Sequence, residues 1–276
     1  MVKDLVVSGT PFELHEIDNV PVHVKREDLC CPLPGPSFSK IRGVKAFLEA
    51  ADHDSVVGVL DTSHSKAGWG VAYICQALGM RCIDFYPVYK GETGLRYIQK
   101  HAHDFEAELV PLPAGRSAIL YHQAMKQLVE MAGEYALMMP NALKLQETVE
   151  ATADELFLYT PESLMCGTWI VSISSGTIAA GVLKGLGHND NVCVIAHMGY
   201  SRSEQAARDY MISMAGGEAE VPPDLVIVDE GYSYKDAVDI DCPFPCNRFY
   251  DLKAWKWLQS HAADLEQPIV FWNIGS

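Results

Sequence analysis

From residue 56 onward, short runs rich in apolar and β-branched residues alternate with helical patterns, and this alternation most restricts the folds open to the chain. Strands are predicted at 56–60, 81–86, 108–112, 135–139, 168–173, 191–197, 225–229 and 268–273. Helices are predicted at 70–78, 93–101, 117–131, 145–156, 177–186, 203–214 and 252–261. Alternation of this kind is typical of mostly parallel sheets with helices on both faces, so the sequence predicts an α/β fold.

The composition excludes several classes of function. A net charge of −15 argues against binding to the phosphate backbone of nucleic acids, because such proteins need clustered Lys and Arg. No apolar run is long enough to cross a bilayer, and the start of the sequence lacks the pattern of a signal peptide. We therefore expect no membrane association and a cytoplasmic location.

The eight cysteines predict a reducing environment and no metal site. Cys75, Cys82 and Cys193 lie within apolar stretches, as buried thiols do. The segment Cys242-Pro-Phe-Pro-Cys246 has no second cysteine or histidine pair nearby at the spacing of a zinc site.

Three strand-to-helix loops are candidate ligand sites, because parallel sheets bind ligands beyond the carboxyl ends of their strands. In the first loop, residues 61–68, Ser63 and Ser65 either bind a substrate carboxylate or cap the following helix. The second, Ser174-Ser175-Gly176-Thr177, combines small residues, hydroxyls and a helix start, which favours a phosphate group, although an ordinary turn uses the same residues. The third, Asp229-Glu230-Gly231-Tyr232, offers carboxylates and a phenol.

Lys40 follows a loop rich in small residues and proline and opens a helical pattern whose apolar residues share one face: Ile41, Val44, Phe47 and Leu48. It is either a solvated lysine at a helix start or an amine that faces a ligand. Lysine forms Schiff bases with aldehydes, and an aldehyde cofactor with a phosphate group needs a loop such as residues 174–177. Together these features predict pyridoxal 5′-phosphate as the cofactor.

The order of the motifs resembles the fold type II, or tryptophan-synthase-β-like, pyridoxal-phosphate enzymes. The nearest branch is that of 1-aminocyclopropane-1-carboxylate deaminase and D-cysteine desulfhydrase, which reads K-R-E-D and then N-K-x-R; this chain has Lys25-Arg26-Glu27-Asp28 and Ser39-Lys40-Ile41-Arg42. The branch's S-N-H-x-x-Q segment with its helix matches residues 65–80, and its S-G-G-T phosphate loop matches residues 174–177. Three later motifs, G-Y-G, D-P-V-Y-x-x-K-A and F-I-H-T-G-G, match residues 231–233, 247–254 and 271–276.

The resemblance implies two three-layer αβα domains with mostly parallel sheets and the cofactor in the cleft between them. The larger domain is expected at residues 1–44 and 146–276, and a smaller inserted domain at residues 45–145. A homodimer is also expected. The implied activity is that of a pyridoxal-phosphate-dependent lyase or deaminase, which acts on an amino acid through a Lys40 aldimine and an α-carbanion.

The resemblance also implies roles for single residues. Lys40 is the Schiff-base lysine and then the base at the α-carbon, and Ser174, Ser175, Gly176 and Thr177 form the phosphate site. Tyr232 either acts as an acid or base or positions the substrate, unless it only packs. Glu230 either pairs with the pyridine nitrogen of the cofactor or is a solvated residue at a strand end.

The substrate loop departs from the family pattern. Lys66 stands where the family has the asparagine that contacts the cofactor's 3′-oxygen, and Ala67 replaces the neighbouring histidine. Lys66 either contacts the cofactor, binds an anionic substrate or is solvated. Ser175 replaces a phosphate-loop glycine, and Ile274 replaces the terminal threonine. These departures predict retained cofactor binding with rebuilt substrate recognition.

Two alternatives to a lyase or deaminase of small amino acids therefore stay open. The first is a pyridoxal-phosphate enzyme that acts, by elimination or decarboxylation, on an amino-acid group attached to a larger carrier such as a modified nucleobase. The second is a homologue without catalytic activity that only binds the cofactor or an amino acid.

Overall fold

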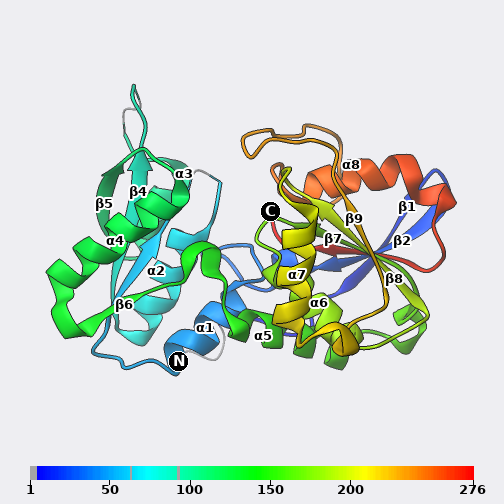
Figure 1. Cartoon of the computed structure of the whole chain (residues 1–276), viewed down its shortest axis with the longest axis horizontal. Helices are drawn as coiled ribbons and strands as arrows, with labels where there is room; N and C mark the ends of the chain where they lie inside the picture. Colours follow the sequence, from blue (N-terminus) through cyan, green and yellow to red (C-terminus); the bar gives the residue numbers. More distant parts are fainter. Residues whose placement is uncertain (1–4, 63, 92–93) are drawn as a thin grey trace. The chain divides into compact units, whose positions relative to one another are not determined.

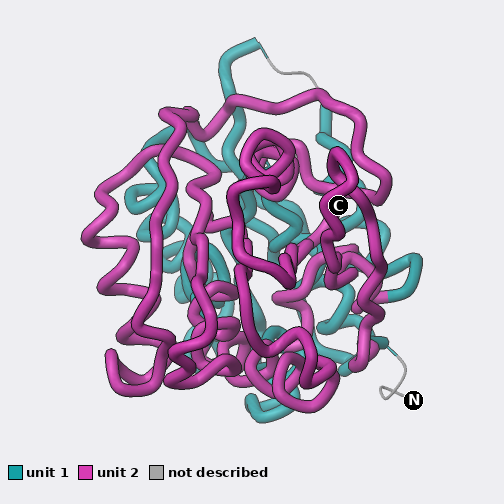
Figure 2. Tube along the Cα trace, turned by 90° about the vertical axis from the view of Figure 1, so that its right-hand side faces the viewer, with its two compact units in different colours: residues 1–6, 32–36, 43–145 teal, residues 7–31, 37–42, 146–276 magenta. Residues whose placement is uncertain are grey.

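The computed structural model describes residues 5–62, 64–91 and 94–276. The chain divides into two compact units (Figure 2). Unit 1 comprises residues 1–6, 32–36 and 43–145, and unit 2 comprises residues 7–31, 37–42 and 146–276. The domain boundaries expected from the resemblance stay a prediction.

Unit 2 is built on a six-stranded sheet in the order β1-β2-β10-β7-β8-β9 (Figure 1). The strands span Phe12–Ile17 (β1), Val20–Arg26 (β2), Gly167–Ile173 (β7), Val192–Met198 (β8), Asp224–Val228 (β9) and Ile269–Asn273 (β10). The β1–β2 pair is antiparallel, and every other pair is parallel. The carboxyl ends of β2, β7, β8, β9 and β10 therefore meet at one edge of the sheet.

Successive side chains of a strand point to opposite faces of the sheet, and the central strands are apolar at successive positions. Both faces are therefore apolar, and helices cover both of them. Trp169 and Val171 of β7 pack in the apolar cluster with three helices: Gln146–Tyr159 (α5), Thr177–Leu186 (α6) and Glu204–Ala215 (α7). Ile170, between them, packs in a second cluster with Asp251–His261 (α8). Unit 2 is thus a three-layer αβα arrangement.

Unit 1 contains a four-stranded parallel sheet in the order β5-β4-β3-β6. The strands span Val56–Leu60 (β3), Arg81–Val88 (β4), Glu108–Pro113 (β5) and Ala136–Met138 (β6). Its helices span Ala67–Leu78 (α2), Tyr97–Asp104 (α3) and Ser117–Ala132 (α4), and α1 (Ile41–Glu49) begins in unit 2 and continues into unit 1. Helix α4 packs on one face through Leu120 and Leu128, while α2 lies on the other face, where Gly68 meets the Asp84 side chain of β4.

The predicted α/β fold with mostly parallel sheets is confirmed. Strands β1 and β2 were not predicted, because the end of β2 carries the charged pair Lys25 and Arg26. Helix α2 begins at Ala67 rather than at residue 70, and α3 begins at Tyr97. The predicted start of α3, at residue 93, lies outside the described residues.

The charged run Lys25-Arg26-Glu27-Asp28 is buried in unit 2 and forms ion pairs. Lys25 Nζ lies 2.7 Å from Glu155 Oε1 of α5, and Arg42 of α1 pairs with Glu27. Arg26 and Asp28 pair with each other at 2.8 Å. Buried charges need such partners, since an unpaired ion is costly in an apolar interior. The run therefore contributes to the core that holds the start of α1.

Candidate functional site

Lys40 lies beside the carboxyl edge of the unit 2 sheet because the backbone on its amino side is bonded to the segment after β10. Phe38 forms an isolated bridge with Gly275, and Ser39 N donates to Ile274 O at 3.0 Å. Arg42, on the other side, donates to Val7 O and pairs with the buried Glu27. The backbone at Lys40 is thus fixed on both sides.

The Lys40 side chain reaches the predicted phosphate loop, which follows β7. Its Nζ donates to Ser175 Oγ at 2.8 Å. The two residues are 135 positions apart in sequence, and the parallel sheet brings them together. An amine and a hydroxyl loop therefore share one site, as the sequence predicts.

The loop Ser174-Ser175-Gly176-Thr177 leads directly into α6. Gly176 has a φ of +91° and serves as the N-cap of the helix, a conformation that favours glycine. Ser175 Oγ and Thr177 Oγ1 are 3.1 Å apart, and both residues are buried. The first amides of α6 have no intrahelical partner and point toward this loop. Donors of this kind fit a phosphate group.

Tyr210 of α7 extends this hydroxyl cluster. Its phenol oxygen lies 3.1 Å from Thr177 Oγ1. A Cβ atom at Gly176 would come within 3.1 Å of the Tyr210 ring and of the Met211 side chain. The loop is therefore closely packed against α7, and only glycine fits at its turn.

The third predicted loop, residues 229–232, is tied to β8. Glu230 Oε2 lies 2.9 Å from Nε2 of His197, which is fully buried near the end of β8. Burial lowers the pKa of His197, although Glu230 opposes the shift. Tyr232 packs under Lys253, whose Nζ lies 4.7 Å from the ring centroid. Glu230 thus contacts the end of β8, whereas Tyr232 contacts α8.

Asp251, the first residue of α8, is a buried carboxyl that the sequence analysis did not single out. It accepts hydrogen bonds from Ser172 Oγ of β7 and from Gly275 N, the latter at 3.2 Å. Burial raises its pKa to about 7, although these hydrogen bonds oppose the shift. The motif alignment of residues 247–254 contains Asp251, but only its burial shows that it can hold a proton near neutral pH.

Three tyrosines also meet near this edge, and none was predicted. The rings of Tyr200 and Tyr234 are 5.4 Å apart in an edge-to-face arrangement. Burial, followed by the neighbouring phenols, raises the pKa of Tyr250 well above its ordinary value. Gly199 permits this packing, because a Cβ there would lie 3.2 Å from the Tyr250 ring.

The remaining predicted residues belong to the start of α2 in unit 1. Ser63 lies outside the described residues. Ser65 Oγ accepts a hydrogen bond from Ala67 N at 3.1 Å, and Lys66 between them is the N-cap residue of α2. Whether Ser65 also binds a substrate carboxylate stays a prediction. Lys66 Nζ lies 5.6 Å from the centroid of the Trp69 ring, and Ala67 is buried as the first residue of α2.

Beneath this loop, unit 1 contains two buried carboxyls, Asp61 and Asp84. Asp61 follows β3 and accepts from Thr62 N at 2.8 Å, whereas neither oxygen of Asp84 has a hydrogen-bond partner among the described residues. Burial, followed by the charge of Asp61, raises the pKa of Asp84 well above its ordinary value, and burial also raises that of Asp61. The pair therefore retains a proton where exposed carboxyls are ionised.

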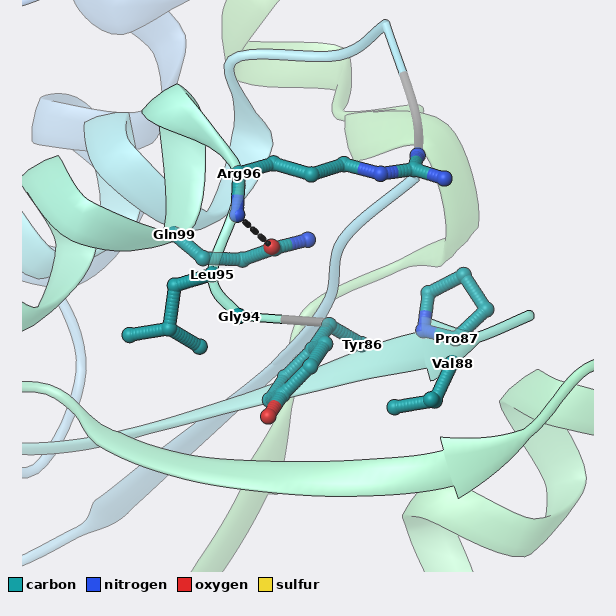
Figure 3. A pocket seen from close by; sticks show the side chains of 7 residues that line it. All are labelled: Tyr86, Pro87, Val88, Gly94, Leu95, Arg96 and Gln99. Atoms are coloured by element: carbon teal, nitrogen blue, oxygen red, sulfur yellow. Dashed lines mark hydrogen bonds between the residues drawn. The ribbon is translucent and has the colours of Figure 1, made fainter. Parts of the chain in front are cut away.

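A small pocket lies elsewhere in unit 1, between the end of β4 and the start of α3 (Figure 3). It is lined by Tyr86, Pro87, Val88, Gly94, Leu95, Arg96 and Gln99. The amide of Arg96 donates to Gln99 Oε1 at 2.8 Å, which closes the first turn of α3. None of the predicted site residues that the structure describes lines this pocket.

Within the described part of the chain, no three His, Cys, Asp or Glu residues are grouped so that they could hold a metal ion. Among the same residues, no helix is both long and apolar enough to cross a membrane. All eight cysteines are free thiols.

Comparison with known proteins decides the family. The family model described as "Pyridoxal-phosphate dependent enzyme" matches residues 4–233. The chain belongs to this family. Its cofactor is pyridoxal phosphate, as Lys40 and the loop at residues 174–177 predict. The predicted relationship to the fold type II enzymes is likewise confirmed.

One relative from Pseudomonas phage M6 is named "Glycyl-dTMP PLP-dependent decarboxylase". It is 51% identical over 282 residues, which cover 98% of this chain and 100% of the relative. The fold of this pyridoxal-phosphate-dependent enzyme is also similar to two solved structures. A 1-aminocyclopropane-1-carboxylate (ACC) deaminase homologue has a TM-score of 0.76 at 20% identity, covering 98% of this chain and 90% of the other. Maize serine racemase has a TM-score of 0.69 at 17% identity, covering 97% and 89%.

Proposed function

We propose that this pyridoxal-phosphate-dependent enzyme is a decarboxylase whose substrate is an α-amino-acid group carried on a pyrimidine nucleotide. The observation that carries the proposal is the 51% identity, over nearly the whole of both chains, to a protein named as a glycyl-dTMP decarboxylase. This is the alternative of an amino-acid group on a larger carrier, and it replaces the small-molecule deaminase as our preferred function. The likeness to the ACC deaminase homologue, at 20% identity, supports the fold alone.

The residues of unit 2 fit the cofactor. Pyridoxal phosphate, when bound, supplies an aldehyde that condenses with primary amines and a ring that accepts the electron pair left by a bond broken at the α-carbon. We assign the covalent attachment of the aldehyde to Lys40, whose Nζ lies 2.8 Å from Ser175 Oγ. Ser174, Ser175, Gly176 and Thr177 hold the phosphate group through their hydroxyls and the first amides of α6.

Two carboxyls are candidates for the partner of the cofactor's ring nitrogen. Glu230 is the residue expected from the sequence; its Oε2 lies 2.9 Å from His197 Nε2, and 31% of its side chain is exposed. Asp251 is fully buried between Ser172 and Gly275, and burial raises its pKa to about 7. A buried carboxyl that shares a proton with a nitrogen strengthens the ring as an electron acceptor. We therefore prefer Asp251 and keep Glu230 as the second candidate.

Decarboxylation and elimination require the lysine to transfer a proton in opposite directions. In an elimination, the lysine must first accept the α-proton, whereas in a decarboxylation it must deliver a proton to the α-carbon after CO₂ has left. Either transfer needs an amine held at the reacting carbon, and the backbone at Lys40 is fixed on both sides through Ser39 and Arg42. We assign delivery of the proton to Lys40 because decarboxylation is the proposed reaction. Tyr232 remains our candidate for positioning the substrate.

The chemistry also restricts the substrate. The amino group must be primary for it to replace the lysine amine, and the carboxylate must be free for it to leave as CO₂. The nucleobase must therefore be joined to the α-carbon of the amino-acid group and not to its nitrogen. The expected product is an aminoalkyl pyrimidine nucleotide. We propose that Ser65, Lys66 and Ala67, together with Ser63, form the loop that distinguishes this substrate from a small amino acid.

The test uses the cofactor-loaded enzyme and a thymidylate that carries a ¹³C-carboxyl glycyl group attached through its α-carbon. We expect labelled CO₂ and an amine product that has lost one CO₂ in mass. Release of ammonia and a keto acid instead would show the deaminase reaction, and no turnover of any amino-acid substrate would favour the alternative without catalysis.

A second measurement tests the lysine independently of the substrate. The near-visible absorption of the bound cofactor should be lost in Lys40→Ala. It should be retained in Lys45→Ala, a change in helix α1, which directly follows Lys40, at a side chain that pairs with Glu49. Retention of the wild-type absorption by Lys40→Ala would contradict the assignment.

A further inference from the structure

Arg202 lies between β8 and α7, and neither the sequence motifs nor the proposed reaction uses it. Its Nε and Nη2 atoms are buried, yet neither has a hydrogen-bond partner among the residues that the structure describes. Arginine is always charged in proteins, and its buried N–H groups are normally bonded. Two buried guanidinium nitrogens without an acceptor among the described residues indicate an anion that the polypeptide does not supply.

The surroundings of Arg202 lead to the phosphate loop. Its guanidinium carbon lies 5.8 Å from the centroid of the Tyr200 ring. Gly199 N donates to Ile173 O at 2.9 Å, so the segment that leads to Arg202 runs beside the end of β7, where the loop at residues 174–177 begins. In agreement with this position, the hydrogen bond with Thr177 and the charge of Arg202 both oppose the burial that raises the pKa of Tyr210. The Tyr210 hydroxyl in turn lies 3.1 Å from Thr177 Oγ1 at the start of α6. Arg202, Tyr210 and Thr177 thus form one continuous neighbourhood.

The charges around this neighbourhood are consistent with an anion. Within the described parts of the chain, Arg202 forms no ion pair with a carboxylate. A second cation, Lys40, contacts Ser175 Oγ of the phosphate loop through its Nζ. A phosphate monoester carries nearly two negative charges at neutral pH, which neutral hydroxyls and amides do not balance. A guanidinium supplies the missing charge and two parallel donors.

We propose that Arg202 binds the phosphate group of the cofactor at the start of α6 and neutralises part of its charge. This inference rests on the proposed placement of the phosphate at residues 174–177. The cofactor is favoured over a phosphate of the substrate because Ser175 joins the same hydroxyl cluster to Lys40, the amine assigned to the cofactor's aldehyde. The usual glycine of the loop is Ser175 here, and Arg202 adds a charge to this altered site.

The experiment compares two ligands that differ only in the phosphate. Cofactor is removed from the holoenzyme with hydroxylamine, and the protein is titrated with pyridoxal phosphate and with pyridoxal while absorption is followed. We expect Arg202→Gln to weaken pyridoxal phosphate by roughly tenfold to a hundredfold, the effect of one charge-assisted hydrogen-bond pair. Binding of pyridoxal should be unchanged. Arg202→Lys, which keeps the charge without the fork, should lose less.

Two controls keep the outcomes distinct. Arg208→Gln removes an arginine of α7 that donates to Leu225 O at 2.7 Å and should leave both affinities unchanged. Thr177→Ala tests the phosphate site itself. If Thr177→Ala weakens pyridoxal phosphate selectively and Arg202→Gln does not, the inference about Arg202 is wrong and the phosphate site stands. If neither variant discriminates between the ligands, the placement at residues 174–177 is wrong as well.

The substrate provides the remaining arm. Arg202→Gln could instead leave the binding of pyridoxal phosphate intact and raise KM for the nucleotide substrate but not for the corresponding nucleoside. That result would show that Arg202 binds the phosphate of the substrate, and the proposal would be wrong. The stability of the cofactor-free protein gives a further check. Because Arg202 Nε and Nη2 have no acceptor in the described part of the chain, Arg202→Gln should not lower that stability.

Discussion

A substitution of Glu155 in α5 is the sharpest test of how the buried ion pairs of unit 2 stabilise the fold around Lys40. Its carboxylate is fully buried and accepts hydrogen bonds from Gly9 N at 2.9 Å, Thr10 N at 2.9 Å and Lys25 Nζ at 2.7 Å. Arg42 Nη2 lies 3.3 Å away. Glu155→Gln keeps the shape of the side chain but removes its negative charge and replaces one of its two acceptor oxygens with an amide donor.

The loss follows from the burial of Lys25, whose side chain has no exposed surface. Of the two acceptors that the described residues give its ammonium, Glu155 Oε1 and Thr10 O, the substitution leaves unchanged the neutral Thr10 O, at 2.6 Å, and removes the charge of the other. Removing one partner of a buried ion pair costs about 3 to 5 kcal/mol. Native proteins are stable by only about 5 to 15 kcal/mol, so Glu155→Gln should remove a large part of the free energy of unfolding.

The assay is equilibrium unfolding in urea, and the control is Glu150→Gln in the same helix. Glu150 also pairs with a lysine, Lys184, at 2.6 Å, but 47% of its side chain is exposed. An exposed pair contributes about 0 to 1 kcal/mol, so this variant should unfold almost like the wild type. Equal losses in the two variants would refute the argument from burial.

The pH dependence gives a second criterion. Burial raises the pKa of Glu155, but Arg42 and Lys25 outweigh it, so the pKa lies below its ordinary value of 4.5. The stabilisation is therefore present above that value and lost as the pH falls through the lower, folded-state pKa. The difference between wild type and Glu155→Gln should shrink in acid, and a difference that grows would contradict the assignment.

Two further predictions concern other parts of the chain. Burial and the charge of Asp61 raise the pKa of Asp84 well above its ordinary value of 3.8. The folded state therefore keeps a proton that the unfolded state releases, and stability falls as the pH rises above 3.8. Asp84→Asn should reduce the drop in Tm between about pH 5 and about pH 8, and an unchanged drop would show that the carboxyl is ionised in the fold. Gly176→Ala should destabilise the protein by about 1 to 2 kcal/mol and also weaken pyridoxal phosphate, since the φ is +91° and the new Cβ meets Tyr210 and Met211 at 3.1 Å. Gly187→Ala, with a φ of +63° and no atom within 4 Å, should cost similar stability without affecting the cofactor, and equal affinities in the two variants would remove Gly176 from the site.

Local patterns were sufficient to predict the loops that follow buried strands. Strand β7 is a continuous buried run from Gly167 to Ile173, and the small residues after it admit little except a turn into a helix. The link between Lys40 and Ser175 depends on the parallel pairing of distant strands, which the strand–helix alternation implies. Once the parallel sheet is inferred, the sequence therefore predicts that Lys40 lies near the loop at residues 174–177.

Periodicity fails where charges are buried. Strand β2 ends in Lys25 and Arg26, which hydrophobic patterns assign to solvent, although both are buried against carboxylates from distant segments. Asp251 and Arg202 were missed for the same reason. A single acid or base in the sequence does not show whether its partner is water, and that depends on the packing around it.

The same buried charges explain why the K-R-E-D run accompanies the lysine motif in this chain. Glu27 and Glu155 both engage Arg42, and Arg42 is two residues beyond Lys40 in the same turn of backbone. Ser39 on the other side is bonded to Ile274, so the backbone of Lys40 cannot shift without breaking buried bonds. A lysine that must serve first the cofactor and then the α-carbon needs a mobile side chain on a fixed backbone. The charged run at residues 25–28 therefore positions the backbone of Lys40. Its loss should displace the Lys40 amine within the site and should not alter the intrinsic reactivity of that amine.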